Sequence, residues 1–221
     1  MIDLQALLAA SAARHSHLCP RQVLGVRTGL TGIARLELTH PIQNKLLLVV
    51  VETDGCFTDG VEVATGCTVG HRTMRVEDYG KIAATFIKVS SGEAVRVSPR
   101  LDVRKRAWDY APDETKHYFA QLQAYQFMPD SDLFNVNEVE LTIPLEKIIS
   151  QAGIRTECDF CGEDIINQRE VHRNGFTLCK TCAGPAYYIN IKDPRNSIVS
   201  ILSSGADHPN HTPPDDSLSG I

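Results

Sequence analysis

The sequence predicts an α+β protein, in which helices pack on a mixed sheet, followed by a small zinc finger. Three observations support this fold class. A continuous apolar strand precedes a hairpin of short strands, and amphipathic helices are interspersed among them. Two Cys-x-x-Cys pairs follow a change of composition at 151–153. We therefore expect a core domain at 1–152, a four-cysteine zinc finger at 153–195 and a disordered tail at 203–221.

Composition and charge exclude several classes of protein. The chain has 221 residues, of which 43% are hydrophobic and 22% charged, as in ordinary globular proteins. Its 22 basic and 27 acidic residues give a formal net charge of −5. Because phosphate neutralisation needs a basic face, this balance argues against a nucleic-acid binder driven by bulk charge.

The apolar segments are too short for a membrane span. The longest dense run, Leu46–Val51, has the length of a strand, whereas a membrane helix needs about 20 residues. The apolar stretch at 4–13 is preceded by Asp3, where a secretory signal would carry Lys or Arg. We therefore expect a cytoplasmic protein that does not enter a membrane.

The core domain is expected to begin with two helices. Leucines at helical spacing predict the first helix at 2–14. Proline suits the first position of a helix, so a second helix should run from Pro20 into the thirties. Three small residues share one face of this helix: Gly25, Gly29 and Gly32. Either another element packs closely on that face, or the glycines simply weaken the helix and form its exit.

The strongest strand signal is the run Lys45–Thr53. Its continuous apolarity predicts a strand that is covered on both faces. Hydrophobic periodicity, prolines and turn residues predict the later elements. We expect a short helix at 56–66 and two strands, at 80–89 and 93–98, joined by a turn at 90–92. A helix at 113–126, which starts at Pro112-Asp113, and a strand at 133–143 should follow.

The two Cys-x-x-Cys pairs have the spacing of a structural zinc site. Cys158 and Cys161 are separated by 17 residues from Cys179 and Cys182. Zn²⁺ favours four tetrahedral ligands, and each short pair can turn two sulfurs toward one point. The turn residues Arg173-Asn174-Gly175 predict a hairpin between the pairs, and a helix near the second pair would complete a treble clef. A redox Cys-x-x-Cys pair and four unrelated thiols are the alternatives, and redox motifs do not come doubled at this spacing.

A four-cysteine site has no open coordination position, so the predicted zinc is structural. The module is too small for an adequate apolar core, and the metal must supply much of its folding free energy. The charges around the cysteines are mixed, which favours contact with a protein partner over contact with nucleic acid. They are Arg155, Arg169, Arg173 and Lys180 against Glu157, Asp159, Glu163, Asp164 and Glu170.

A second group of metal-ligating side chains precedes Pro20. His17 and Cys19, with His15 as a weaker third member, could converge whether this link is extended or helical. Imidazole with thiolate suits a transition metal. Alternatively, the helix N-terminus activates Cys19 as a nucleophile with His17 as its base. The third interpretation is two surface histidines and a buried thiol.

Two further cysteines and an aspartate extend this group. Cys56 follows the end of the strongest strand, and Asp59 lies one helical turn beyond it. Cys67 lies in a polar turn. Each cysteine alone is typical of a small core residue, but three thiols and two histidines within a short span favour a shared cleft. The candidate catalytic residues are Cys19, His17, Cys56, Asp59 and Cys67.

Several motifs together resemble the E-subunit family of formylmethanofuran dehydrogenase. The resemblance covers nearly all of residues 10–190, and its most specific motifs are HxHxCP and TGCTxG in this order. They stand here as His15-Ser16-His17-Leu18-Cys19-Pro20 with Gly25-Val26-Arg27, as the segment from Cys56 to Gly70, and as Asp78-Tyr79-Gly80-Lys81-Ile82-Ala83. The resemblance implies an α+β core, in some members followed by a treble-clef zinc finger, and a homodimer.

The resemblance also implies a cleft. His17 and Cys19, with His15 nearby, map to one wall of this cleft. The second wall maps to Cys56, Asp59, Thr65 and Cys67. The segment that follows this wall maps to Tyr79-Gly80-Lys81. Two small departures fall beside these residues: Ser16 stands where the family usually has glycine, and Gly60 where it usually has alanine.

Three functions follow from these patterns. The first is an accessory or subunit-like protein with a structural zinc and a His/Cys cleft for a second transition metal or a small ligand. Formylmethanofuran dehydrogenase itself is a molybdenum or tungsten enzyme, and this chain lacks a ferredoxin-like cysteine cluster. The second function is a stand-alone enzyme that uses Cys19 and His17 as nucleophile or metal ligands. The third is a regulatory module whose zinc finger contacts protein or nucleic acid.

Overall fold

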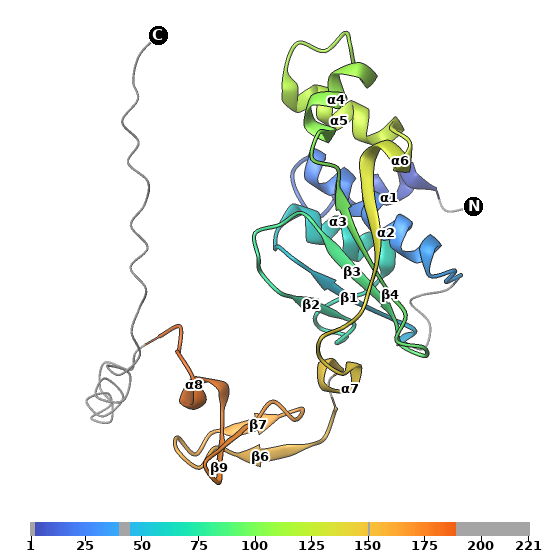
Figure 1. The fold of residues 1–221 in the computed structure, drawn as a ribbon. Helices are drawn as coiled ribbons and strands as arrows, with labels where there is room; N and C mark the ends of the chain where they lie inside the picture. Colours follow the sequence, from blue (N-terminus) through green and yellow to red (C-terminus); the bar gives the residue numbers. More distant parts are fainter. Residues whose placement is uncertain (1–2, 40–44, 150, 189–221) are drawn as a thin grey trace. The chain divides into compact units, whose positions relative to one another are not determined.

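The computed structural model describes residues 3–39, 45–149 and 151–188. It divides the chain into two compact units, 1–150 and 151–221 (Figure 1). The tail expected at 203–221 and the last part of the expected zinc finger, 189–195, lie outside the described residues.

The N-terminal unit contains helices and strands in mixed order, as an α+β protein does (Figure 1). Its elements are α1 (Leu4–Ala12), α2 (Pro20–Arg35), β1 (Leu47–Val51), α3 (Cys56–Thr65), β2 (Met74–Val76), β3 (Ala84–Lys88), β4 (Ala94–Pro99), α4 (Val103–Tyr110), α5 (His117–Phe127), α6 (Asp130–Leu133), β5 (Phe134–Val139) and α7 (Leu145–Ile148).

Five strands form one mixed sheet in the order β2-β1-β3-β4-β5. The pair β1–β2 is parallel, and the other three pairs are antiparallel. Gly92, with a φ of 77°, lies in the turn that joins β3 to β4. The predicted fold class, an α+β mixed sheet packed with helices, is confirmed.

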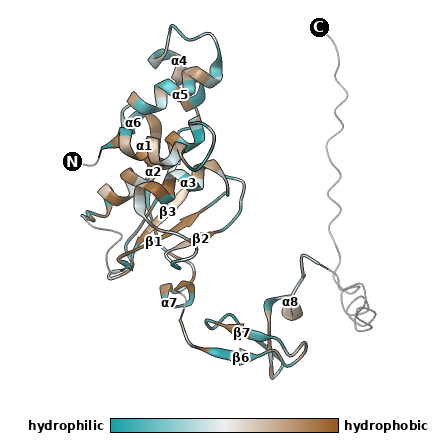
Figure 2. Cartoon of the chain, turned by 180° about the vertical axis from the view of Figure 1, so that it is seen from behind, coloured by the Kyte–Doolittle hydropathy of each residue, from teal (hydrophilic) through white to brown (hydrophobic). Residues whose placement is uncertain are grey.

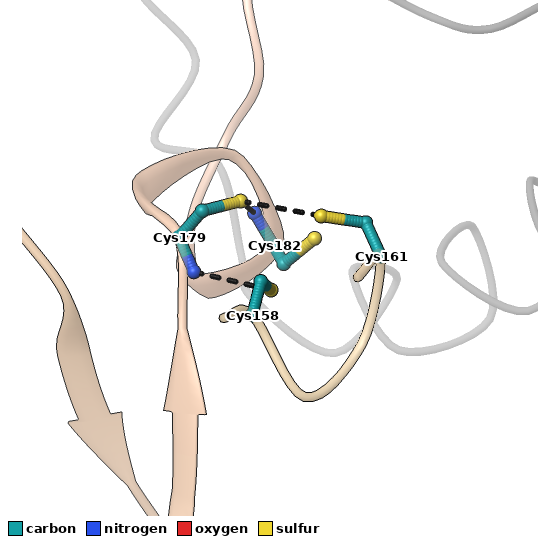
Figure 3. Close-up of side chains that lie close together, drawn as sticks. All are labelled: Cys158, Cys161, Cys179 and Cys182. Atoms are coloured by element: carbon teal, nitrogen blue, oxygen red, sulfur yellow. Dashed lines mark hydrogen bonds between the residues drawn. The ribbon is translucent and has the colours of Figure 1, made fainter. Parts of the chain in front are cut away.

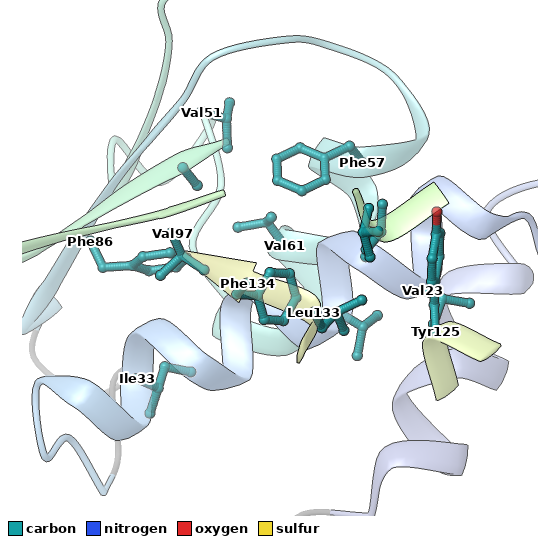
Figure 4. Packing of buried hydrophobic residues seen from close by; sticks show 14 of the residues in the cluster. Val23, Ile33, Val51, Phe57, Val61, Phe86, Val97, Tyr125, Leu133 and Phe134 are labelled. Atoms are coloured by element: carbon teal, nitrogen blue, oxygen red, sulfur yellow. The ribbon is translucent and has the colours of Figure 1, made fainter. Parts of the chain in front are cut away.

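One face of the sheet carries the main hydrophobic core. Alternate residues of β1, β3 and β4 point into it, including Val51, Phe86 and Val97 (Figure 4). Helix α2 contributes Val23 and Ile33, and α3, α5 and α6 add further apolar side chains. Strand β1 is correspondingly hydrophobic along its length (Figure 2).

The opposite face of the sheet carries a smaller core. Leu48, Ile87 and Ala94 are buried there beneath side chains from the segment that follows β5, such as Leu141 and Leu145. Because β1 is covered on both faces, its unbroken apolar run is explained by burial rather than by helical structure.

Two glycines of α2, Gly25 and Gly29, form a close contact with α3, and the third, Gly32, packs on the ring of Phe86 in β3. A Cβ atom at Gly25 would lie 2.1 Å from the carbonyl oxygen of Phe57, and one at Gly60 would lie 2.4 Å from that of Gln22. Farther along, a Cβ at Gly29 would lie 2.6 Å from that of Ala64. Contacts therefore advance in the same direction along both helices, so α2 and α3 run parallel with their N-termini at the same end. This confirms the packing interpretation of the glycines.

Several predicted boundaries were wrong, and four elements of the N-terminal unit were not predicted, namely α4, α6, α7 and β2. Helix α5 begins at His117 rather than at Pro112-Asp113, because residues 111–116 form the connection that folds α5 back onto α4. The last strand ends at Val139 instead of 143. Strand β2 has only three residues and α4 only eight. Segments this short show no clear hydrophobic periodicity in the sequence.

The C-terminal unit has two small hairpins and one short helix. Strand β6 (Arg155–Glu157) pairs with β7 (Asp164–Ile166), and β8 (Val171–Arg173) pairs with β9 (Phe176–Leu178). Asn174 and Gly175 both have positive φ between β8 and β9, as expected of a tight hairpin turn. Helix α8 (Lys180–Ala183) ends at Gly184.

The buried ion pair between Glu52 and Arg96 should be a large local contribution to stability. Glu52 is only 7% exposed, and its two carboxylate oxygens accept bonds of 2.6 and 2.7 Å from Arg96. We expect Glu52→Ala to lower the free energy of unfolding by about 3 kcal/mol, because it leaves a half-buried guanidinium unpaired. The exposed pair Arg100–Asp102, 3.6 Å apart, supplies the control Asp102→Ala, for which urea denaturation should show a loss below about 1 kcal/mol. Equal losses in the two variants would contradict this prediction.

Candidate functional site: a four-cysteine cluster and a thiol pocket

The four cysteines of the C-terminal unit converge on one point (Figure 3). Their sulfur atoms all lie within 4.8 Å of one another. Cys158 and Cys161 come from the turn after β6, and Cys179 and Cys182 come from the start of α8. The first pair lies in the turn of the β6–β7 hairpin, and the β8–β9 hairpin lies within the 17 residues that separate it from the second pair.

Local hydrogen bonds form the two turns that hold these thiols. The Gly162 N–H donates to the Cys158 carbonyl at 2.9 Å, and Gly162 takes a φ of 75° to do so. The backbone N–H of Cys179 donates to the Cys158 sulfur at 3.2 Å, and that of Cys182 donates to the Cys179 sulfur at 3.4 Å. These N–H groups stabilise thiolates.

The electrostatics of the cluster distinguish its members. Burial alone would raise the pKa of the Cys158 thiol, but backbone N–H donors from Cys161, Cys179 and Phe160 outweigh it and lower this pKa to about 6. Burial, and then neighbouring thiols, raise the pKa of Cys182. A thiolate at Cys158 beside three further thiols is suited to attract a cation.

The dimensions of the cluster fit a metal ion. Around a tetrahedral Zn²⁺ with Zn–S bonds of about 2.3 Å, the sulfurs lie about 3.8 Å apart. The sulfurs of Cys161 and Cys179 are 3.9 Å apart. The cluster could therefore hold a metal with all four cysteines as ligands, which leaves no position for a substrate.

A pocket of about 730 Å³ lies in the N-terminal unit, and three of the predicted site residues line it. They are His17, Cys19 and Cys56. Elements remote in sequence complete the walls: the start of α2, the loop from β4 into α4, and one face of α5 with Tyr118 and Tyr125.

Cys19 is placed by the start of α2. It is the N-cap residue, with extended backbone before Pro20, as the proline predicted. Its N–H donates to the side-chain oxygen of Gln22 at 2.9 Å, and the amide nitrogen of that fully buried glutamine donates to the carbonyl of Ser11 at 2.8 Å. The Cys19 backbone is thereby fixed between α1 and α2, and its thiol lies partly exposed at the pocket.

Cys56 is placed by the start of α3, which runs parallel to α2. Burial, and then the neighbouring Cys19 thiol, raise the pKa of the Cys56 thiol. Burial, and then the same two cysteines, raise the pKa of Tyr118, which lines the pocket with them. Two thiols and a phenol therefore share one part of the pocket. Burial also raises the pKa of Tyr125, to about 12.

Other predicted members of the cleft lie elsewhere in the structure. The Nε2 atom of His15 pairs with the Asp59 carboxylate at 2.5 Å, and neither residue lines the pocket. Thr65 is the last residue of α3 and Cys67 lies just beyond it, about 15 Å from Cys56 along a helix of 10 residues. The Cys67 sulfur is buried, 3.6 Å from the carbonyl of Leu47, and burial raises its pKa. Tyr79 and Lys81 are exposed.

The pocket also contains residues that sequence reasoning missed. Arg21, Arg100, Arg104, His117 and Tyr118 all line it. His117 stacks on Trp108 with ring centroids 5.6 Å apart, and its Nε2 atom lies 2.6 Å from the Arg104 carbonyl oxygen. The basic run at 104–106 was the one available signal, but only the packing of α4 on α5 makes it a pocket wall.

The positions of the His, Cys, Asp and Glu side chains show which of the two sites is arranged as a metal site. Within 3–39, 45–149 and 151–188, the four-cysteine cluster is the only group of three or more His, Cys, Asp or Glu that converges as a metal site would. In the same ranges, every helix is too short or too polar to cross a membrane.

Comparisons with known proteins place the chain in a family. A family model described as "FmdE, Molybdenum formylmethanofuran dehydrogenase operon" matches residues 14–135. A protein of Archaeoglobus fulgidus, described as a probable S-adenosyl-L-methionine-binding protein, is 30% identical over 205 residues. That match covers 83% of this chain and 54% of the relative, so the chain spans about half of the relative's length.

A solved structure supports the fold. The crystal structure of a protein from Syntrophus aciditrophicus, described as FmdE-like after a tungsten formylmethanofuran dehydrogenase, matches with a TM-score of 0.55. The match covers 85% of this chain and 96% of that protein, at 20% identity. The family model spans more than half of the chain and includes His17, Cys19 and Cys56, and on that ground the protein belongs to the FmdE family.

Proposed function

We propose that this protein is an accessory, subunit-like member of the FmdE family with two binding sites. The N-terminal unit binds a small ligand at the pocket lined by His17, Cys19 and Cys56. The C-terminal unit binds one structural Zn²⁺ through Cys158, Cys161, Cys179 and Cys182. The observation that carries the first part is the meeting of Cys19 and Cys56, from the N-termini of two parallel helices, in a pocket of about 730 Å³.

The chemistry of the pocket supports a reactive thiol beside an imidazole. Cys19 is partly exposed at the start of α2, so a ligand in the pocket can reach its thiol. His17 and Tyr118 can donate or accept a proton beside it. The volume of the pocket falls within the range of about 300–1,000 Å³ that is typical of small-molecule sites.

The name of the Archaeoglobus relative makes S-adenosyl-L-methionine a second candidate ligand. Tyr118 and Tyr125 give the pocket aromatic walls on which an adenine ring could stack. Among the described residues that line the pocket, no Asp or Glu offsets the sulfonium charge, whereas three are arginines. Calorimetric titration with S-adenosyl-L-methionine tests this candidate, and we expect weaker binding than for an anionic ligand of similar size.

Alkylation and metal analysis of the full chain test the main proposal. We expect iodoacetamide to modify Cys19 rapidly near neutral pH and to leave the buried Cys67 unmodified, as peptide mass spectrometry would show. The variant Cys19→Ser should keep its thermal stability and about one zinc per chain, because Cys19 is not a zinc ligand. A Cys19 as unreactive as Cys67 would overturn the pocket's role. A second metal equivalent that Cys19→Ser abolishes would make the pocket a metal centre instead.

The exposed surface of the C-terminal unit supports a protein partner. In the C-terminal unit, Phe160, Ile166 and Phe176 are each about half exposed, at 48%, 47% and 57%. Together with the mixed charges of this unit, they support contact with a protein partner. We further propose a cytoplasmic homodimer, for which light scattering coupled to size-exclusion chromatography gives the oligomeric state directly.

A further inference from the structure

The thiol pocket carries an excess of positive charge. Arg21 on α2, Arg100 after β4 and Arg104 on α4 line it, and no carboxylate of the described residues does. The whole chain has 22 basic and 27 acidic residues, so this local excess runs against the composition. Charge of one sign in a hollow with apolar walls raises the local concentration of the opposite ion.

Two of these arginines, Arg21 and Arg104, differ from several other arginines of the same unit in their partners. Arg14, Arg27, Arg96 and Arg106 each form an ion pair with a carboxylate. Within the described residues, Arg21 and Arg104 form none. These two guanidinium groups therefore remain available to a ligand.

Arg100 supplies a further observation. Its side chain is 42% exposed and forms an ion pair with Asp102, but its Nε atom is buried and makes no hydrogen bond within the described part of the chain, since the Asp102 carboxylate oxygen is 3.6 Å away. A buried donor without an acceptor is costly, and a carboxylate or phosphate oxygen would satisfy it. The parallel N-termini of α2 and α3 add positive potential at the same place.

We infer that the pocket binds a small organic anion whose carboxylate or phosphate group is held by Arg100 and Arg104. Arg21 stands at the rim of the same pocket. The rest of the ligand lies against Leu24 and Tyr118, which brings it to the thiols of Cys19 and Cys56. This inference rests on the proposed role of the pocket and specifies the charge of what enters it.

Calorimetric titration of the zinc-loaded full chain tests the inference. The probes are malonate, inorganic phosphate and the uncharged malonamide. We expect at least one anion to bind saturably, more weakly as NaCl is added, and malonamide not to bind. Binding of malonate alone identifies a carboxylate ligand, and binding of phosphate alone identifies a phosphate ligand. Failure of both anions at tens of millimolar would overturn the inference.

Matched variants locate the bound anion. Arg104→Gln should weaken binding about tenfold, and Arg104→Lys should weaken it less, because the charge remains while the planar fork is lost. Arg35→Gln at the other end of α2 is the control, since Arg35 is exposed and far along the helix. Equal weakening by Arg35→Gln and Arg104→Gln, with circular dichroism showing both folded, would overturn the inference.

Alkylation of Cys19 separates this inference from the proposed function. Bound anion should slow the reaction of Cys19 with iodoacetamide in wild type but not in Arg104→Gln. If Cys19 is reactive but no anion binds, the inference fails and the thiol pocket remains. If Cys19 is also unreactive, both fail.

Discussion

Replacing Cys158 with serine should unfold the C-terminal unit and leave the N-terminal unit folded. Among the described residues, this unit buries only Ile165 and Ala183 as apolar side chains besides Cys158 itself. So small a core cannot offset the chain entropy of folding, and a bound metal must supply about 10 kcal/mol. Loss of one ligand removes most of that contribution.

Limited proteolysis followed by mass spectrometry measures this effect. The Cys158→Ser chain should be cut rapidly within 151–188 and remain protected within 3–149, and chelation of wild type should give the same pattern. Thr181→Ser, between two ligands, keeps all four thiols and should resemble wild type. Loss of protection in the N-terminal unit would refute the expected division at about residue 152.

Adding a single methyl group at Gly60 should be nearly as damaging to the N-terminal unit. A Cβ there would lie 2.4 Å from the Gln22 carbonyl oxygen and 2.7 Å from the Val26 nitrogen. Both are backbone atoms of α2, so the helices themselves must separate. Alanine gains about 1 kcal/mol over glycine in helix propensity, but overpacking of this kind costs about 3 kcal/mol or more. The net effect of Gly60→Ala is therefore destabilisation.

Urea denaturation of Gly60→Ala beside Gly70→Ala tests this prediction. Gly70 has open space around its Cα, so its variant should change the free energy of unfolding by less than about 0.5 kcal/mol. Separation of α2 from α3 should also move Cys56 away from Cys19, which a bifunctional thiol cross-linker would report as a lower yield. Equal stability of the two variants would show that the helix pair adjusts freely.

Features that depend on local pattern could be predicted from the sequence. The four-cysteine cluster follows from spacing, the position of Cys19 follows from Pro20, and β1 follows from its apolar run. The glycines of α2 predicted a close neighbour because only small side chains allow backbones to approach. That this neighbour is α3 is a tertiary fact, although Gly60 on α3 is the matching small residue.

The pocket itself could be predicted only in part. Cys19 and Cys56 meet because α2 and α3 run parallel, which no local pattern specifies. Cys67 is close to Cys56 in sequence but lies at the opposite end of α3, because that helix separates the two residues. Arg100 and Arg104 become pocket residues only when α5 folds back on α4, and the sequence prediction began α5 too early, at Asp113, to indicate that return.

The second core sets a minimum length for any separately produced N-terminal piece. Leu141, Leu145, Ile148 and Ile149 cover Leu48 and Ile87 on the reverse of the sheet. A protein truncated after β5 would expose those side chains to solvent and invite self-association. Fusion or dissection experiments on this family member should therefore cut after Ile149, where the wrapping segment has completed its contact.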